Sequence, residues 1–385
     1  MNFEVYLLLG ISSEFEIFQN FITIFRFQTL KKLKKKSYHI IGVMSGTSLD
    51  GIDLAEIVFN YSEEKWDFEI LAAETVSYSS FWKDELREAI NYSNEQLERL
   101  DFKFTEKLSE EISKFIKKHN IQEIDAICSH GHTILHQPDK GLTYQIGNLP
   151  RISKLLGQTV VCDFRVQDVE LGGQGAPLVP IGDKLLFSEY DYCLNLGGFA
   201  NCSFEENGKR IAFDICPANI VLNKYAEKLG QDFDESGKLA ASGKVDEDLL
   251  KRLNSISFYN EKPPKSLGLE WVQSIIFPLL EAAEVSSEDI LRTFTEHIAI
   301  QLANQFSKNA SVLITGGGVY NSFLIERLKD LTSIEVIIPS PGIVEYKEAL
   351  IFGLLGVLKL HDEVNCLASV TGASKDHSSG KIFYS

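Results

Sequence analysis

Two short turns rich in Gly, Ser, Thr and Asn have the composition of phosphate-binding segments. The first consists of Gly46, Thr47, Ser48, Leu49, Asp50, Gly51, Ile52 and Asp53, and the second contains Gly197, Gly198 and Asn201. Each turn lies between two apolar runs, and each could expose backbone N–H groups with no bulky side chain in the way. One turn falls in each half of the chain, which predicts two related halves that hold one nucleotide. A phosphotransferase is therefore the leading hypothesis.

The first turn also offers hydroxyls and carboxylates. It is not a P-loop, because it has no lysine. Thr47 and Ser48 could donate to phosphate oxygens, and Asp50 or Asp53 could hold Mg²⁺ directly or through water. Asp214, after a predicted strand of the second half, could also serve the metal. A plain hairpin is the alternative for the first turn, since Asp-Gly is a common turn signal.

A third glycine turn follows an apolar run in the second half. It contains Gly316, Gly317 and Gly318, and a predicted helix begins shortly after it. Glycines let a flat ring or a phosphate approach the backbone, and a helix N-terminus favours an anion. We interpret this turn as the purine side of a nucleotide clamp. A close packing joint between strand and helix is the alternative.

The segment from Asp163 to Pro180 is the densest in polar residues and glycine. It holds two aspartates, Asp163 and Asp168, with Arg165 between them. Phosphorylation of a hydroxyl requires a base near the acceptor oxygen, and aspartate commonly serves. His130 and His132 would share one face of an extended chain and could bind substrate, although a packed pair of imidazoles is the alternative.

Composition narrows the class of protein. The 385 residues fit two domains, and a formal net charge of −16 argues against nucleic acid as a partner. The six cysteines contain no C-x-x-C pair, which predicts reduced core thiols. Residues 1–37 combine an interrupted apolar stretch with a basic run, and we interpret them as an unstructured or mis-assigned extension rather than a surface anchor. No stable membrane insertion is expected.

Apolar periodicity predicts an α/β protein with two similar domains, residues 38–188 and 189–385, and a cleft between them. We expect strands at 38–45, 52–59, 66–77, 124–129, 143–146, 159–162, 190–196, 200–204, 210–213, 311–315 and 334–338. We expect helices at 79–91, 102–119, 219–229, 289–306 and 344–360, and one that begins near residue 320. Residues 230–265 read as an insertion on the second half.

In several motifs the chain resembles the anhydro-N-acetylmuramic acid kinases, a branch of the sugar kinase and actin-like ATPase superfamily. The motifs are GVMSGTSLDGID (42–53), SHGHT (129–133), QIGN (145–148), DFRVQDVELGGQGAPLVP (163–180), NLGGFAN (195–201), PPKS (263–266), TGGG (315–318) and KEAL (347–350). The resemblance runs from about Tyr38 to Gly372. It implies two actin-like, ribonuclease H-like domains.

The resemblance also implies a reaction. Such kinases use ATP and Mg²⁺ to convert 1,6-anhydro-N-acetylmuramic acid into N-acetylmuramic acid 6-phosphate in cell-wall recycling. Water attacks the anomeric carbon and the freed O6 takes the γ-phosphoryl group. By match to the family pattern the base is Asp168, with Asp163 as the alternative. The candidate substrate ligands are His130, Gln145, Asn148, Arg165 and Gln174. A cytoplasmic homodimer is expected.

Some positions depart from the family pattern, and other functions stay open. His132 stands where Gln is common, and residues 214–219 are less glycine-rich than usual.

An ordinary hexose or amino-sugar kinase on the same fold is one alternative function, with Asp168 then acting on a sugar hydroxyl. A non-catalytic ATP-binding sensor is another, and a membrane-associated protein led by the N-terminal segment is a third.

Overall fold

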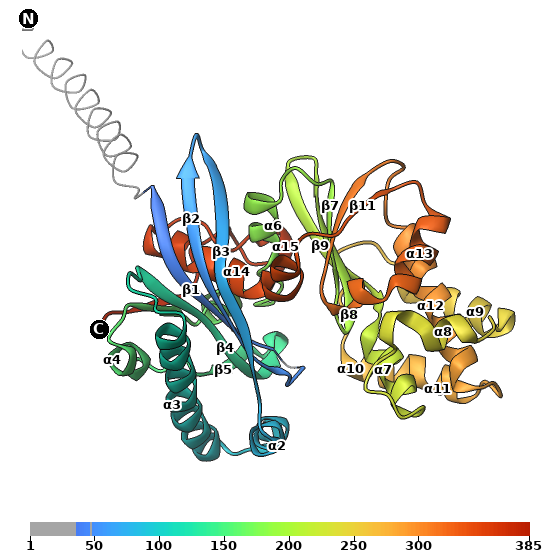
Figure 1. Ribbon diagram of the computed structural model, residues 1–385, viewed down its shortest axis with the longest axis horizontal. Helices are drawn as coiled ribbons and strands as arrows, with labels where there is room; N and C mark the ends of the chain where they lie inside the picture. The colour runs from blue at the N-terminus through green and yellow to red at the C-terminus, as the bar shows by residue number, and fades with distance from the viewer. Residues whose placement is uncertain (1–35, 47) are drawn as a thin grey trace, which may run out of the picture.

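Two β-sheets, each covered by helices, form the two halves of the molecule (Figure 1). The computed structural model describes residues 36–46 and 48–385. Thr47 and residues 1–35 of the predicted extension lie outside these ranges. The mixed α/β architecture with two sheets confirms the predicted fold class.

The first sheet is built mainly from the N-terminal half of the chain. Its strands are β1 (Ser37–Ser45), β2 (Gly51–Ser62), β3 (Lys65–Ser77), β4 (Ala126–Gln137), β5 (Leu142–Ile146), β6 (Val160–Cys162) and β12 (Lys381–Phe383). Their order is β12-β6-β4-β1-β2-β3, and β5 pairs with β4. β1, β2 and β3 form an antiparallel meander, whereas β4 is parallel to β1 and β6 is parallel to β4.

The second sheet repeats this plan. Its strands are β7 (Tyr192–Leu196), β8 (Phe199–Glu206), β9 (Lys209–Pro217), β10 (Ser311–Thr315) and β11 (Glu335–Ile337). The order is β11-β10-β7-β8-β9, with an antiparallel meander of β7, β8 and β9 and parallel β10 and β11. The two sheets therefore share one five-strand topology, which confirms that the domains are similar. The first turn joins β1 to β2, and the second joins β7 to β8.

Helices cover both faces of the first sheet. The helical segments of this part are α2 (Ser80–Glu88), η1 (Ala89–Asn91), α3 (Asn94–Lys118), η2 (Pro138–Lys140), α4 (Arg151–Leu156), α5 (Val166–Glu170) and α6 (Pro180–Leu186). α3 begins earlier than the predicted residue 102, because Ser93 and Gln96 form a capping box at its N-terminus. Its apolar side buries Phe104, Leu108 and Ile112 against one face of the sheet.

The long C-terminal helix α14 (Pro341–Leu360) covers the other face of the first sheet. The helix lies so close to β1 that the strand needs a glycine, because a Cβ at Gly42 would overlap the carbonyl of Ala349. A Cβ at Gly356 would likewise overlap the thiol of Cys128. Beyond α14 the chain forms α15 (Ala368–Thr371) and then β12, which pairs with β6. The segment after residue 340 thus returns to the first sheet, so a single division at residue 188 does not describe where these elements lie.

The second sheet carries the remaining helices. They are α7 (Asn219–Glu227), η3 (Glu235–Gly237), α8 (Lys238–Ser242), α9 (Glu247–Asn254), η4 (Ser257–Asn260), α10 (Leu269–Trp271), the π-helix η5 (Val272–Ile276), α11 (Phe277–Glu281), α12 (Ser287–Ala303), η6 (Gly317–Tyr320) and α13 (Ser322–Leu331). α12 confirms the predicted helix at 289–306, and its apolar side is buried, including Leu291, Phe294 and Ile298. The predicted insertion at 230–265 is folded into η3, α8, α9 and η4.

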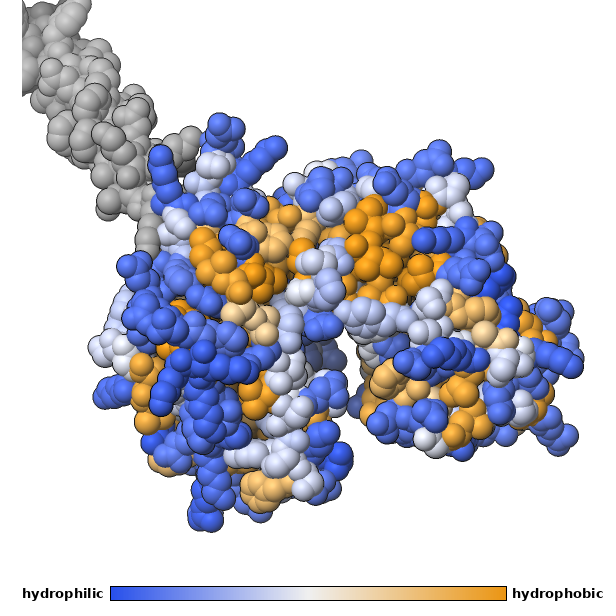
Figure 2. Space-filling model, in the orientation of Figure 1, coloured by the Kyte–Doolittle hydropathy of each residue, from blue (hydrophilic) through white to orange (hydrophobic). Residues whose placement is uncertain are grey.

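The surface is hollowed between the two halves. Figure 2 shows an open notch below the region where the two lobes join, with polar side chains on both of its sides. A cleft between domains agrees with the predicted arrangement. Among the helices of the described part of the chain, none is long and apolar enough to cross a membrane.

Candidate active site

The first turn connects the end of β1 to the start of β2, and few backbone hydrogen bonds fix it among the residues described there. Leu49, in the left-handed region at φ 60°, donates its N–H to the carbonyl of Gly46 at 3.3 Å. At the far end, the carboxylate of Asp53 accepts from the hydroxyl of Thr75 at 2.6 Å. Burial, and then the nearby charges of Asp50 and Glu345, raise the pKa of Asp53. Carboxylates therefore crowd this end of the turn, where a cation would relieve their repulsion.

The second turn is held firmly by its neighbours. The carbonyl of Gly198 accepts from the N–H groups of Ala218 and Ile220 at 2.8 and 3.2 Å, and that of Gly197 accepts from Asn219 at 3.2 Å. These N–H groups lie at the N-terminus of α7, where they would otherwise lack partners. The first N–H groups of α7 are thus already used by the turn, which leaves the open glycine faces of the turn itself as the approach for a phosphate.

The third glycine turn packs directly on the end of β7. A Cβ at Gly316 or Gly318 would come within 2.8 Å of the carbonyl oxygen of Leu196, and Gly316 has φ 85°. Gly317 differs, because a Cβ there meets no described atom within 4 Å. Two of the three glycines therefore serve the packing joint, and Gly317 leaves an open side on which a flat ring could lie.

A row of polar side chains crosses the second sheet at its turn end. Thr315, Asn195, Asn201 and Asp214 occupy paired positions on β10, β7, β8 and β9. Paired positions on neighbouring strands bring side chains together on one face. Asp214 accepts from the N–H of Leu267 at 2.8 Å, and burial raises its pKa. The metal candidates Asp50 and Asp214 thus belong to opposite halves.

The two histidines of β4 do not share a face, and that prediction is wrong. His130 stacks against Phe352 of α14, whereas His132 contacts Phe104 of α3 on the other side of the sheet. The reason is Gly131, whose φ of 74° interrupts the strand register and reverses the alternation. His132 instead bonds Ser45 at 2.7 Å, beside the first turn, and burial lowers its pKa to about 4.

Arg165 connects several predicted substrate ligands. Its Nε donates to His130 Nε2 at 2.8 Å, and another guanidinium nitrogen donates to the carbonyl of Gly175 at 2.6 Å. Burial, and then the charge of Arg165, hold the pKa of His130 well below its usual range. Asn148 donates to the carbonyl of His130 at 3.4 Å. His130, Asn148 and Arg165 therefore form one contiguous polar group.

The other two substrate candidates lie differently. Gln145 is buried on β5 and donates to the hydroxyl of Thr143 at 2.8 Å. Its Oε1, like the Oδ1 of Asn148, is buried without a hydrogen-bond partner among the described residues. Unsatisfied buried oxygens are expensive unless a ligand donates to them. Gln174 is exposed, and its backbone N–H donates to the carbonyl of Thr371 at 2.8 Å.

The N-terminal part of α14 connects the glycine turn of the second half to the first turn. The N–H of Gly316 donates to the carbonyl of Val344 at 3.2 Å, and the hydroxyl of Tyr320 donates to Glu345 at 2.8 Å. The negative charge of Glu345 in turn helps to raise the pKa of Asp53. The start of α14 therefore lies where both halves meet.

Glu348, three residues further along α14, is a candidate that the sequence did not single out. Its side chain is exposed, yet the surrounding protein removes water from the carboxyl and raises its pKa. The positive charge of Arg165 opposes this rise and the negative charge of Asp53 adds to it. The sequence signals were the KEAL motif and a Glu beside a Lys in a largely apolar helix.

Lys347, in the same KEAL motif, is buried rather than solvated. It is 5% exposed and forms an ion pair with Asp183 of α6 at 2.7 Å. The same carboxylate accepts from Ser203 of β8 at 2.5 Å, and Arg210 of β9 donates to Ser203 at 2.7 Å. This buried joint links α6 and α14 to the second sheet, because each charge is stabilised by a partner across the boundary.

The two candidate bases are both engaged. Asp168 is fully buried and accepts from Gly175 N–H and Thr371 Oγ1, each at 2.7 Å. Asp163 follows β6 with φ 59° and pairs with Lys381 of β12 at 2.7 Å. In the arrangement described here, neither carboxylate is free to take a proton from water in the cleft.

All six cysteines are buried and free of disulfides, which confirms the prediction of core thiols. They are Cys128, Cys162, Cys193, Cys202, Cys216 and Cys366. Burial raises the pKa of Cys216, which follows Asp214 by two residues on β9. Cys216 therefore stays a protonated packing residue.

Comparison with known proteins identifies the class. The two sheets share one five-strand topology, and each has a glycine turn after the first strand of its meander. The family model and the curated relatives define the class as a kinase, that is, a phosphotransferase. The family model described as "Anhydro-N-acetylmuramic acid kinase" matches residues 38–385. The chain belongs to this family.

The relatives span nearly the whole chain. The anhydro-N-acetylmuramic acid kinase of Francisella tularensis subsp. novicida (strain U112) is 33% identical over 89% of this chain and 98% of its own. That of Pseudomonas syringae pv. tomato (strain ATCC BAA-871 / DC3000) is 34% identical over 90% and 99%. Among solved structures, component A of (R)-2-hydroxyglutaryl-CoA dehydratase from Acidaminococcus fermentans matches at 15% identity over 84% of this chain and 98% of its own, with a TM-score of 0.43.

Proposed function

We propose that this kinase opens 1,6-anhydro-N-acetylmuramic acid with water and transfers the γ-phosphoryl group of ATP to the freed O6. The products are N-acetylmuramic acid 6-phosphate and ADP. The observation that carries the proposal is family membership over residues 38–385, in a fold whose two equivalent turns lie at the ends of β1 and β7. This reaction belongs to peptidoglycan recycling, and we place the protein in the cytoplasm.

The nucleotide fits between the two turns. The first turn, from Gly46 to Asp53, and the open faces of Gly197 and Gly198 would contact the phosphates, while Gly317 leaves room for the purine. Carboxylate oxygens are the ligands that Mg²⁺ prefers. Asp50 and Asp214 would hold Mg²⁺, which when bound neutralises charge on the transferred phosphoryl group.

The sugar fits beside Arg165. His130 accepts a hydrogen bond from Arg165 and is kept neutral by burial, so the pair holds a fixed orientation. The unsatisfied oxygens of Asn148 and Gln145 would accept from sugar hydroxyl or amide N–H groups. Arg165 supplies positive charge for a carboxylate such as the lactyl group of the substrate.

Attack by water on the anomeric carbon requires a base. The base takes one proton from the water, the bond from the anomeric carbon to the bridging oxygen breaks, and that oxygen becomes the acceptor O6. Asp168 and Asp163 are the predictions from sequence, but both are engaged in the structure. We favour Glu348, because it is exposed and has a raised pKa beside Arg165 and Asp53.

Release of ADP tests the function. With Mg-ATP, we expect turnover on 1,6-anhydro-N-acetylmuramic acid and none on N-acetylmuramic acid, N-acetylglucosamine or glucose. Turnover on a reducing sugar alone would make the protein an ordinary sugar kinase. ATP binding without turnover on any of the four sugars would favour a sensor.

Three variants rank the bases in the same assay. Glu348→Gln should lower kcat by about 10²–10⁴-fold while ATP binding is kept, as expected on loss of a general base. If Asp168→Asn or Asp163→Asn instead abolishes turnover in a folded protein that binds both substrates, the base lies there. Circular dichroism checks that each variant is folded.

We further propose a homodimer. Figure 2 shows apolar side chains gathered along the upper surface of both lobes, of the kind that subunit interfaces cover. Light scattering after size exclusion measures the mass, and a monomer at micromolar concentration would contradict the proposal.

A further inference from the structure

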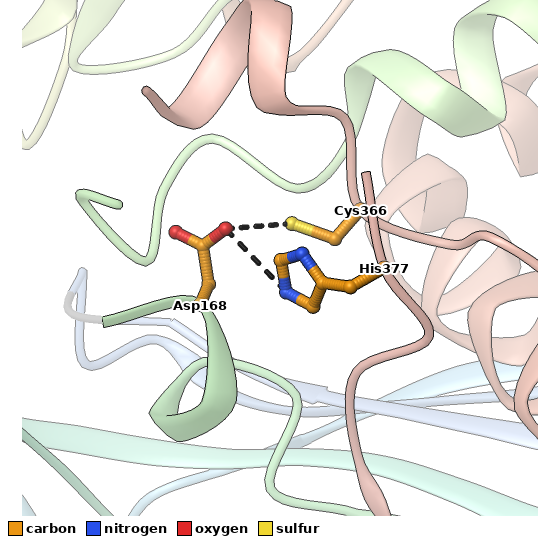
Figure 3. Close-up of side chains that lie close together, drawn as sticks. All are labelled: Asp168, Cys366 and His377. Atoms are coloured by element: carbon orange, nitrogen blue, oxygen red, sulfur yellow. Dashed lines mark hydrogen bonds and ion pairs between the residues drawn. The ribbon is translucent and has the colours of Figure 1, made fainter. Parts of the chain in front are cut away.

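Three side chains from distant parts of the sequence meet in a buried cluster. Asp168 comes from α5, while Cys366 and His377 lie on either side of α15 (Figure 3). Their exposed fractions are 0%, 1% and 5%. The carboxylate, thiol and imidazole offer one ligand atom each, and these atoms lie within 4.8 Å of one another.

The backbone fixes two of the three positions. Cys366 and His377 form an isolated antiparallel bridge, in which each N–H donates to the other's carbonyl, at 3.1 and 3.2 Å. Residues paired in this way carry their side chains on the same face. The thiol and the imidazole therefore point together at Asp168, as Figure 3 shows.

The tautomer of His377 is set by its other ring nitrogen. Nδ1 lies 3.1 Å from the carbonyl oxygen of Lys375, and a carbonyl can only accept, so Nδ1 carries a proton. In a neutral imidazole Nε2 then has a bare lone pair. That lone pair faces Asp168 Oδ1 at 3.6 Å and has no hydrogen-bond partner among the described residues.

The Nε2 lone pair of His377 has no donor in this dry site, and the oxygen that it faces, Asp168 Oδ1, accepts from Thr371 and Cys366. Buried lone pairs that oppose each other are costly unless a cation or a proton lies between them. The outer contacts are those of a metal site. Metal-bound histidine usually donates its other N–H to a backbone carbonyl, and ligating carboxylates are themselves hydrogen-bonded. Here Lys375 supplies that carbonyl, and Gly175 N–H donates to Asp168 Oδ2 at 2.7 Å.

We propose that Asp168, Cys366 and His377 bind a divalent transition-metal ion of the zinc class. A sulfur, a nitrogen and an oxygen ligand suit Zn²⁺ and exclude Mg²⁺, which takes oxygen ligands. Binding displaces the thiol proton of Cys366, which now donates to Asp168 Oδ1 at 3.0 Å, and releases it to solvent. The hydroxyl of Thr371, 2.7 Å from the same oxygen, is at hand as a fourth donor.

Such an ion would act as a structural staple. It would join Asp168 of α5, which is three residues after Arg165, to the C-terminal segment. That segment carries Cys366 and His377 and continues into β12. A ligand that binds only the folded state stabilises it by mass action. The proposal does not depend on the proposed reaction, because the base favoured there is Glu348 and the tests of the metal site measure binding and spectra rather than turnover.

The test uses the purified full-length protein after prolonged dialysis against a chelator. We expect one equivalent of Zn²⁺ to bind and to raise the melting temperature. Co²⁺ should produce a thiolate-to-cobalt charge-transfer absorption. Cys366→Ser should remove that absorption, whereas Cys202→Ser, at a buried cysteine on β8, should keep it.

A second measurement guards against a variant that fails to fold. X-ray absorption on the zinc-loaded protein should give one sulfur at about 2.3 Å with nitrogen and oxygen at about 2.0–2.2 Å. Absence of stoichiometric metal, with NMR showing His377 protonated on both ring nitrogens, would overturn the proposal and make the cluster an ion pair. Zinc bound with no sulfur ligand would also overturn it.

Discussion

The two glycine turns occupy equivalent positions in two sheets of the same topology, but they are held very differently. The carbonyls of Gly197 and Gly198 accept from the first N–H groups of α7, and Gly316 and Gly318 pack against Leu196 beside them. Among the residues described there, the first turn has one internal backbone bond, from Leu49 to Gly46, and one from outside, from the N–H of Tyr78 to the carbonyl of Asp50, both at 3.3 Å.

The difference indicates that the two turns have different roles in binding the nucleotide. A turn fixed by a helix N-terminus and a packing joint is a preorganised surface, whereas a lightly held turn can adjust when a ligand arrives. We infer that the second turn defines where the nucleotide sits and that the first turn closes on its phosphates. The joint around Lys347 is where the two halves would transmit that movement.

The largest effect is expected where the halves are joined. Lys347→Met leaves the buried Asp183 carboxylate with Arg210, 3.9 Å away, as its one charged partner among the described residues, so the free energy of unfolding should fall by about 3–5 kcal/mol. Lys184→Met is the matched control, because Lys184 neighbours Asp183 but forms an exposed pair with Glu205 at 3.4 Å. Urea unfolding of both variants measures the difference. Equal losses would show that the joint adds no stability.

The next effect tests the rigid support of the second turn. Gly316→Ala places a Cβ against Asn195 and Leu196 at a φ of 85°, and should destabilise by about 2–3 kcal/mol through overlap and left-handed backbone. Gly317→Ala, next to it but open, should change stability by about 0.5 kcal/mol or less. Thermal unfolding compares the pair. A tolerated Gly316→Ala would remove the packing joint from the account.

Acid should weaken both halves through buried histidines, which are His130 and His132 in the first half and His297 in the second. Burial lowers the pKa of His132 to about 4 and that of His297 to about 3. Below the unfolded value of about 6.5, the unfolded chain gains these protons first. The free energy of unfolding should then fall by about 1.4 kcal/mol per pH unit for each histidine, until the pH reaches its folded pKa.

Single variants separate the two contributions. Replacing His132 by Gln should reduce the slope of stability against pH by about 1.4 kcal/mol per pH unit between about pH 6.5 and 4. His297→Gln should reduce the slope by the same amount down to about pH 3. Urea midpoints across this range provide the measurement. An unchanged slope in the His132 variant would mean that this histidine is protonated in the folded protein.

The smallest effect on stability should come from the first turn. A Cβ at Gly46 would reach Ser48 Oγ only at 3.6 Å, an ordinary contact, so Gly46→Ala should alter unfolding by about 0.5 kcal/mol or less. Loss of close backbone approach should still weaken ATP binding by about tenfold, as for one lost charged hydrogen bond. Calorimetric titration with ATP checks this, and unaltered affinity would argue against the turn as a phosphate site.

Local signals predicted the elements well. The strands at 38–45, 52–59 and 66–77 and the closing helix at 344–360 match β1, β2, β3 and α14 closely, because alternation and apolar periodicity are strong there. The start of α3 was missed, since the capping box at Ser93 precedes the apolar stripe. β12 was missed because three residues carry little pattern and their partner, β6, lies far away in the sequence.

The site was predicted less completely. The turns and the group around Arg165 follow from motifs, but three features depend on tertiary contacts. The irregular backbone at Gly131 places His130 and His132 on opposite faces of the sheet. Lys347 is buried and pairs with Asp183. The pKa of Glu348 is raised because the surrounding protein removes water from its carboxyl. None of these effects is visible in the spacing of the residues concerned.

The most direct test of the account follows an oxygen atom from water. With Mg-ATP and 1,6-anhydro-N-acetylmuramic acid in water labelled with heavy oxygen, mass spectrometry of the product locates the label. We expect one labelled oxygen at the anomeric carbon and an unlabelled phosphate ester at O6. Product without the label at the anomeric carbon, or phosphorylation with the anhydro bridge intact, would contradict the proposed hydrolytic kinase.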